Sequence, residues 1–405
     1  MLRFICIGSP LRRLLTENNM NPLRHPALLA SLILASVVIN LPAHASKPYF
    51  PPDAPNQQQP SRRATVELLF VLDTTGSMGG MLDGAKAKIW GIVNDVLQQQ
   101  GNGGATVRVG LVAYRDRGDA YVTRITPLTD NLDAVYAQLM SFKAQGGGDG
   151  PEDVRSAMAE AVRVGGWSAP GPRTSQVMFL VGDAPPHDDY RNLPSTTASS
   201  RHAAGRGIIV NAIQCGSDAA TTQAWRGIAQ YGGGEYFAIA QDGGVAVMIT
   251  PYDDQLARLG EQIGGTYMAY GASEKRMARQ SAQVAMESNV VAAAPAAAKA
   301  DRALNKALND RAYDDSDLLQ KAESGRVALP QIAEAELPDS LRRLAPEQRQ
   351  AALDKAVAQR KALRAQIVVL SKQREQYLAA QRSKGGAAQS GFDGAVSNAL
   401  QRQIK

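Results

Sequence analysis

The sequence predicts an α/β protein: a doubly wound, mostly parallel sheet flanked by helices, followed by an α-helical C-terminal region. Between residues 64 and 271, short runs of β-branched and apolar residues alternate with longer amphipathic runs. Strands that are apolar on both faces and separated by helices are typical of a parallel sheet covered on both sides. Beyond residue 272 the strand pattern stops, and the chain becomes rich in Ala, Gln, Arg and Lys, which favours helices.

Each element of this sheet has its own signal. Buried strands are expected at 65–72 (TVELLFVL), 106–114 (TVRVGLVAY), 176–181 (QVMFLV) and 208–214 (IIVNAIQ). Helices are expected at 80–100, 131–143, 154–164, 219–231 and 249–264. Residues 121–128 follow the second strand after a glycine-containing polar tip (RDRGD), so they are expected to form an antiparallel edge strand.

The C-terminal region, 272–405, contains a helical stripe of apolar residues. Its clearest members are Leu353, Leu363, Ile367 and Leu370. A coiled-coil register with these residues inside also places Arg360 and Arg374 inside, which disfavours a long zipper; packing on a partner or within a helical hairpin is predicted instead. Residues 331–384 hold 11 Lys or Arg against 6 Asp or Glu. We interpret this excess as a solvated face, with weak contact to anionic envelope polymers as the alternative.

Composition excludes several classes of protein. With 405 residues and 44% apolar residues, the chain is not wholly disordered. Its net charge of +6 is too small to indicate a nucleic-acid partner. The cysteines are Cys6 and Cys215, which is not a disulfide framework, and Cys215 at a strand end is expected to be a buried apolar group.

The N-terminal segment reads as an export signal. After Met20, a short basic stretch precedes an apolar run at 27–39 and the sequence Ala43-His44-Ala45. This is the layout of a secretory signal peptide over residues 1–45, with cleavage after Ala45; residues 1–19 are interpreted as an overlong start. Residues 46–63 are rich in Pro and Gln and are predicted to be a linker. We therefore expect a periplasmic or secreted protein without a transmembrane segment after signal removal.

Oxygen-bearing side chains follow two of the predicted strands. The first strand leads into Asp73-Thr74-Thr75-Gly76-Ser77, in which Asp73, Thr75 and Ser77 alternate. The strand at 176–181 is followed by Gly182 and Asp183. Ligands bind at the carboxyl ends of strands in such sheets, and carboxylate and hydroxyl oxygens suit Mg²⁺, Mn²⁺ or Ca²⁺.

These motifs resemble a von Willebrand factor A (vWA) domain, a Rossmann-like fold, with a metal-ion-dependent adhesion site. The resemblance covers 64–271 and depends on DTTGSM, GGGDGPE and FLVGDAPPH in this order. It implies that Asp73, Thr75, Ser77 and Asp183 bind the ion. The family's threonine in the Gly-rich loop has no counterpart here; Asp149 stands in its place, and Glu152 is the alternative ligand. The tail resembles that of exported bacterial vWA proteins.

The missing threonine changes the expected chemistry of the site. A third carboxylate beside Asp73 and Asp183 over-neutralises a divalent ion, so the ion should be held more tightly and should attract an acidic ligand less. Such a site is predicted either to be structural or to prefer a neutral or amide ligand.

Three functions are compatible with these residues. The first is an exported, metal-dependent protein-binding role of the adhesion or scaffold type, with Mg²⁺ as the expected ion and a protein as the partner. The second is a metal-dependent hydrolase with His187 and Asp188 at the rim of the site. The third is an envelope scaffold that acts through the helical tail with a purely structural metal. Because no GxSxG, HExxH, P-loop or kinase signature occurs in the sequence, we expect a non-enzyme.

Overall fold

The computed structural model describes residues 64–100, 105–148, 150–245, 248–385 and 391–404. These residues all belong to one compact unit, Pro48–Lys405. The expected signal peptide and linker, and the candidate ligand Asp149, lie outside the described residues. The domain boundaries and the export signal therefore stay predictions.

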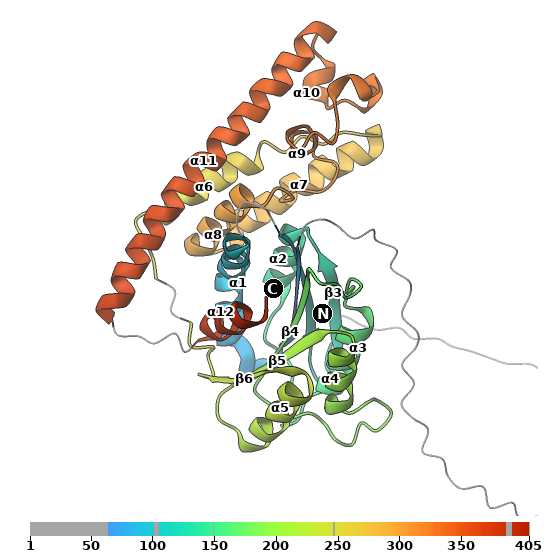
Figure 1. Cartoon of the computed structure of the whole chain (residues 1–405), viewed down its shortest axis with the longest axis vertical. Helices are drawn as coiled ribbons and strands as arrows, with labels where there is room; N and C mark the ends of the chain where they lie inside the picture. Colours follow the sequence, from blue (N-terminus) through green and yellow to red (C-terminus); the bar gives the residue numbers. More distant parts are fainter. Residues whose placement is uncertain (1–63, 101–104, 149, 246–247, 386–390, 405) are drawn as a thin grey trace, which may run out of the picture. The chain divides into compact units, whose positions relative to one another are not determined.

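The sheet has six strands in the order β3-β2-β1-β4-β5-β6. Their bounds are Thr65–Asp73 (β1), Thr106–Tyr114 (β2), Thr123–Thr129 (β3), Thr174–Gly182 (β4), Ile208–Cys215 (β5) and Gly233–Ile239 (β6). Only β3 runs antiparallel to its neighbour, and the other pairs are parallel. The predicted fold class is confirmed, including the antiparallel edge (Figure 1). Strand β6 has no counterpart among the strands that the sequence predicts.

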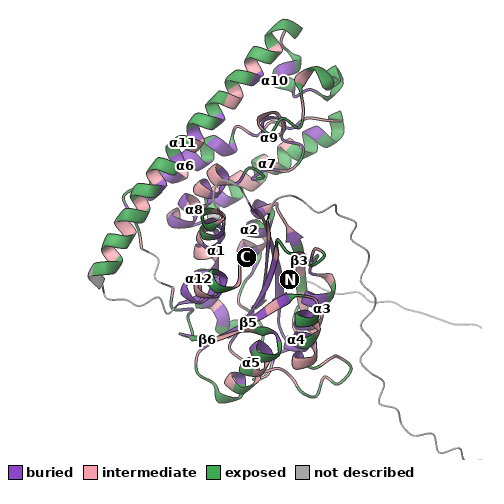
Figure 2. Ribbon diagram, in the orientation of Figure 1, coloured by how far each residue is buried: buried purple, intermediate pink, exposed green. Residues whose placement is uncertain are grey.

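Helices cover both faces of the sheet. On one face lie α1 (Gly79–Gln99), α2 (Leu132–Ser141) and α12 (Phe392–Gln403), which share a core with Phe70 of β1. On the other lie α3 (Val154–Val164), α4 (Thr196–Gly205) and α5 (Ala219–Tyr231), which share a core with Leu69 and Val71. Successive residues of a strand point to opposite faces, so the apolar run of β1 supplies both cores and is almost wholly buried (Figure 2).

Side-chain caps explain why several helices begin where the sequence predicts. Asn131 accepts a hydrogen bond from the Ala134 amide, Asp153 from that of Ser156, and Asp218 from that of Thr221. Asn and Asp satisfy amides that have no partner inside the first turn of a helix. The bounds of α3 and α5 match the predicted ranges. Helix α4 was not predicted, because its sequence TTASSRHAAG lacks an apolar stripe.

The rest of the described chain is helical, with six further α-helices in the described ranges. They are α6 (Asp253–Gly264), α7 (Ser273–Ala293), α8 (Ala296–Leu308), α9 (Leu318–Glu323), α10 (Asp339–Arg342) and α11 (Pro346–Gly385). Helix α8 contacts α1, α6 and α11. The buried Arg302 guanidinium of α8 lies 2.6 Å from Asp133 of α2 and 2.7 Å from Glu287 of α7. None of the helices in the described ranges is long and apolar enough to cross a membrane.

The apolar stripe of α11 packs on the protein's own helices. Leu353, Leu363 and Ile367 are buried, and so is Arg360. Arg374, which the register also places inside, is half-buried. Each arginine meets a carboxylate distant in the sequence: Arg360 pairs with Asp317, and Arg374 with Asp253 and Asp301. The two arginine charges, which disfavour a coiled coil, are thus neutralised by carboxylates of the same chain.

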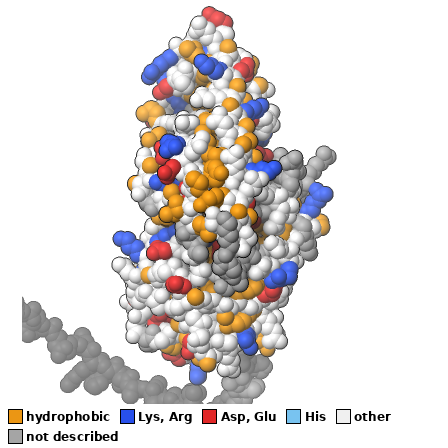
Figure 3. Space-filling view, turned by 90° about the vertical axis from the view of Figure 1, so that its left-hand side faces the viewer, with side chains coloured by type: hydrophobic (Ala, Val, Ile, Leu, Met, Phe, Trp, Pro, Cys, Tyr) orange, Lys and Arg blue, Asp and Glu red, His pale blue; other side chains and the backbone are white. Residues whose placement is uncertain are grey.

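Part of α11 leaves apolar side chains uncovered. Val368 and Val369 are 41% and 60% exposed. Beside them, a shallow groove is lined by residues of α6 and α11: Gln255, Leu259, Ala365, Gln366, Val369 and Leu370. Figure 3 shows hydrophobic side chains gathering over the helical region on this side of the molecule.

The last helix, α12, returns to the sheet. Phe392, Val396 and Leu400 are almost fully buried in the core that α1 and α2 share, and the Phe392 ring lies 6.1 Å from that of Phe70. The Asn211 amide of β5 donates to Gln403 at 2.8 Å. The end of the described chain therefore contributes to the same core as the first strand.

Candidate metal centre

Asp73 ends β1 beneath the turn that the sequence singled out. Its side chain is fully buried. One carboxylate oxygen, Oδ1, accepts hydrogen bonds from the Thr75 amide at 2.8 Å and from the Thr75 hydroxyl at 2.6 Å. The other oxygen, Oδ2, is buried without a hydrogen-bond partner. A buried charged oxygen without a partner is costly, so Oδ2 is an available ligand position.

Asp183 reaches the same region from the neighbouring strand. Because β1 and β4 pair in parallel, with Leu72 opposite Val181, Asp73 and Asp183 leave the sheet at the same edge. The Asp183 carboxylate accepts a hydrogen bond of 2.5 Å from the Gln241 amide, and its backbone carbonyl accepts one of 3.2 Å from the Thr221 hydroxyl. The sequence motif predicts Asp183 but neither Gln241 nor Thr221.

The Gly-rich loop approaches this edge with its backbone. The Gly76 amide donates to the Gly146 carbonyl at 3.1 Å, and Gly146 and Gly147 have φ of +83° and +78°. A Cβ atom on Gly147 would lie 3.0 Å from Glu152 Oε1 and 3.2 Å from the Thr75 Cβ. Glycine is therefore required here both for backbone conformation and for close approach.

Glu152, the alternative ligand of the sequence analysis, is directed into the site. Its side chain is 3% exposed, and Oε2 is buried without a hydrogen-bond partner. Its backbone is held by the loop after β4: its amide donates to the Pro185 carbonyl at 3.0 Å, and its carbonyl accepts from the His187 amide at 3.1 Å. Two orphaned carboxylate oxygens, one on Asp73 and one on Glu152, thus occur at this edge of the sheet.

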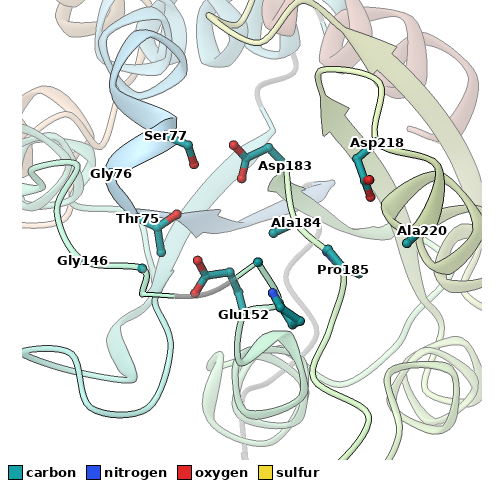
Figure 4. Close-up of a pocket in the computed structure, with 13 residues that line it drawn as sticks. Thr75, Gly76, Ser77, Gly146, Glu152, Asp183, Ala184, Pro185, Asp218 and Ala220 are labelled. Atoms are coloured by element: carbon teal, nitrogen blue, oxygen red, sulfur yellow. The ribbon is translucent and has the colours of Figure 1, made fainter.

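Together these loops enclose an open cavity of about 590 Å³. Its lining comprises Thr75, Gly76, Ser77, Gly146, Gly147, Gly150, Pro151, Glu152, Asp183, Ala184, Pro185, Asp218 and Ala220. In Figure 4 the oxygens of Thr75, Ser77, Glu152 and Asp183 point into the same space. Asp218, the cap of α5, adds a further carboxylate that the sequence analysis missed.

The donor set fits a hard divalent cation. Within the described ranges, no three His, Cys, Asp or Glu side chains are grouped closely enough to hold a metal alone. The candidate set therefore depends on two hydroxyls, of Thr75 and Ser77, as well as on carboxylates. Oxygen-only sets of this kind suit Mg²⁺ or Ca²⁺ rather than zinc. The two orphaned carboxylate oxygens are the observation that favours a cation here.

Electrostatics support the same conclusion. Burial raises the pKa of Asp73 to about 7; the Asp183 charge adds to this effect, and hydrogen bonds from Thr75 oppose it. Burial also raises the pKa of Glu152 to about 9, together with the charges of Asp73, Asp116, Asp119 and Asp183. Both carboxyls resist ionisation because negative charge is concentrated in a poorly hydrated place. A bound cation would relieve this cost.

These pKa shifts predict how stability depends on pH in chelator. The folded chain binds protons at Asp73 and Glu152 above their usual values of 3.8 and 4.5, so the free energy of unfolding is expected to fall as pH rises through their raised values. The expected loss between pH 5 and pH 8 is on the order of 5 kcal/mol, because both carboxyls are buried and a tenfold change in proton affinity corresponds to about 1.4 kcal/mol. Urea denaturation in EDTA at the two pH values measures it.

A matched pair of variants tests which group is responsible. Glu152→Gln removes one of the two carboxyls and is expected to reduce the pH slope, whereas Glu347→Gln, at an exposed position in the first turn of α11, is expected to leave it unchanged. An unchanged slope in Glu152→Gln would show that this carboxyl does not titrate as described.

The polar tip after β2 holds the backbone of the loops around the site. The Arg115 guanidinium donates to the Thr74 carbonyl at 3.1 Å and to the Lys143 carbonyl at 2.7 Å. Asp119 accepts a hydrogen bond of 3.0 Å from the Gly147 amide. Arg117 donates to Asp153 at 3.1 Å and lies 3.6 Å from the centroid of the Tyr190 ring. Arg117 and Asp119 of the RDRGD tip are therefore engaged in internal contacts.

His187 and Asp188, the expected rim residues, do not line the cavity. His187 stacks on Tyr190 with 4.2 Å between ring centroids, and its Nδ1 lies 2.8 Å from Asp189. The Asp188 carbonyl accepts a hydrogen bond from Arg155 at 3.0 Å. Cys215 is buried and burial raises its pKa, which agrees with an apolar role and not with a nucleophilic one.

Comparison with known proteins agrees with this fold. The family model of the von Willebrand factor A domain matches residues 67–241. The von Willebrand factor A domain-containing protein 7 of Rattus norvegicus is 36% identical over 123 residues, and that of Homo sapiens 35%. Each match covers 30% of this chain and 12% of the relative, so the chain spans only a small part of the length of these relatives. Residues 67–241 thus match the model of the von Willebrand factor A domain.

The crystal structure of the SpRpn10 VWA domain aligns with 44% of this chain and 89% of that chain, with a TM-score of 0.32 and 10% sequence identity.

Proposed function

We propose that this chain is an exported protein that binds a divalent cation, most simply Mg²⁺, at the carboxyl edge of its vWA sheet and uses the surrounding loops to bind a protein partner. The observation that carries the proposal is the pair of buried carboxylate oxygens without partners, Asp73 Oδ2 and Glu152 Oε2. The ion would be held by the residues that the resemblance to vWA domains implies: Asp73, Thr75, Ser77 and Asp183. Glu152 would add a carboxylate.

The chain's own residues have distinct tasks in this proposal. Thr75 orients Asp73 through two hydrogen bonds to Oδ1, which leaves Oδ2 for the ion. Gln241 orients Asp183. The ion would neutralise the buried carboxylates and provide a coordination position that an oxygen of the partner completes. Export is proposed from the signal sequence alone.

The hydrolase alternative has little support in the geometry. Hydrolysis needs a base beside the attacking water, and neither His187 nor Asp188 lines the cavity. The scaffold alternative is favoured by one observation, the exposed Val368 and Val369 on α11, because exposed apolar patches mark interaction surfaces. We retain it as the second candidate.

A pull-down from envelope extract with the full chain separates the two candidates. In Mg²⁺, the wild type is expected to retain its partner, whereas EDTA or Asp73→Asn is expected to release it. Val369→Ser is expected to have no effect. If the same proteins are retained in EDTA and lost in Val369→Ser, the helical region carries the binding and the proposed role of the ion is wrong.

A further inference from the structure

The cavity is lined by ionisable side chains of one sign. Among its described lining residues, Glu152, Asp183 and Asp218 are acidic, and none is Lys, Arg or His. Asp73 lies buried beside them. Because Glu152 is almost wholly buried and its Oε2 has no partner, the acidic character is built into the wall of the cavity and is not a chance grouping of surface carboxylates.

Nearby arginines belong to the supporting loops. Arg115 directs its donors to the backbone carbonyls of Thr74 and Lys143. Arg117 pairs with Asp153 and stacks on Tyr190. Neither lines the cavity, so a ligand that enters it meets carboxylates and no protein cation from the described lining.

We infer that the partner inserts a basic side chain, lysine or arginine, into this cavity. This inference rests on the proposed ion site. A bound divalent ion favours the ionised forms of Asp73 and Glu152, and together with Asp183 and Asp218 these four carboxylates then outnumber its two positive charges. An acidic side chain would approach a site of net negative charge, whereas an ammonium or guanidinium is attracted to it. Asp218, the exposed N-cap residue of α5, lines the cavity. Its carboxylate is therefore placed to contact the ammonium or guanidinium of the inserted side chain.

Asp218 also offers a clean variant. Its Oδ1 caps α5 by accepting hydrogen bonds from the Thr221 amide at 2.7 Å and the Thr221 hydroxyl at 2.6 Å. Asparagine caps helices as well as aspartate does, so Asp218→Asn removes a charge while it keeps the cap. Asp218 is not among the proposed ion ligands, so the variant should still hold the ion at saturating Mg²⁺.

The test measures binding of four defined probes to the full chain: the N-acetyl amides of lysine, arginine, glutamine and glutamate. The methyl groups of Ala184 and Ala220 line the cavity, so alanine-methyl NMR reports on binding there. In saturating Mg²⁺, the lysine and arginine amides are expected to shift these signals in a saturable way, and the glutamate amide is not. Asp218→Asn should weaken lysine binding about fivefold, and Glu347→Gln should not.

Tighter binding of the glutamate amide, no binding of either basic amide, or an unchanged affinity in Asp218→Asn would each overturn the inference. Thermal unfolding tests the ion site separately. If Mg²⁺ does not raise the Tm of the wild type, the proposed function is wrong, and lysine binding in EDTA still decides the charge preference of the cavity.

Discussion

Asp73→Asn is expected to abolish the rise in Tm that Mg²⁺ produces in the wild type. A ligand that binds only the folded chain stabilises it by about 3 kcal/mol at a hundred times its Kd, which corresponds to roughly 5 °C for a chain of this size. Asparagine keeps an oxygen that accepts from the Thr75 amide, but it lacks the anionic oxygen on which a hard cation depends. The variant should therefore fold normally and lose the ion.

Differential scanning calorimetry with and without Mg²⁺ measures this effect. Asp218→Asn is the matched control, because it makes the same change of charge at the mouth of the cavity and should keep the full rise in Tm. In EDTA at pH 8, Asp73→Asn is expected to be at least as stable as the wild type, since burial opposes ionisation of Asp73 and raises its pKa. An equal rise in wild type and Asp73→Asn would place the ion elsewhere.

Arg360→Met is expected to cost the helical region about 3–5 kcal/mol. Arg360 and Asp317 are both fully buried and form an ion pair. The same guanidinium donates to the Thr266 hydroxyl and the Thr266 carbonyl, each at 2.7 Å, and lies 4.8 Å from the centroid of the Tyr313 ring. Its removal leaves Asp317 buried with an uncompensated charge, which is the main source of the loss.

Two further variants isolate this cause. Asp317 also caps α9 by accepting from the Gln320 amide at 3.2 Å. Asparagine can keep this cap, so Arg360→Met with Asp317→Asn should recover part of the lost stability. On the same helix, Arg382 pairs with Glu375 at an exposed position, and Arg382→Met should cost less than 1 kcal/mol. Urea denaturation followed by circular dichroism compares them. Equal losses in Arg360→Met and Arg382→Met would show that the buried pair adds nothing.

Local sequence patterns were sufficient for most of the sheet. The continuous apolar run of β1 could only be buried on both faces, and this requires helices on both sides. Capping residues such as Asp153 and Asp218 marked helix starts. The sequence pattern does not reveal β6, because the strand begins with Gly233 and Gly234 and most of it is only partly buried, which leaves no apolar run to recognise.

Only part of the candidate metal centre could be predicted from the sequence. Asp73, Thr75, Ser77 and Asp183 could be named in advance, because each follows a strand whose carboxyl end must lie at the ligand-binding edge. Counting along a Gly-rich loop does not decide whether Asp149 or Glu152 belongs to the proposed ion site, since glycine permits many backbone paths. The fold directs Glu152 into the cavity by bonding its backbone to Pro185 and His187.

Sequence alone thus determined the fold class, the order of the strands' motifs and four of the proposed ligands, because these depend on periodicity and on short motifs. The tertiary structure decided which long-range partners those residues meet. Arg360 lies 43 residues from Asp317, and Asn211 lies 192 residues from Gln403. Pairings of this kind, like the acidic lining of the cavity, arise only when distant segments pack together, since no local pattern encodes the distance between them.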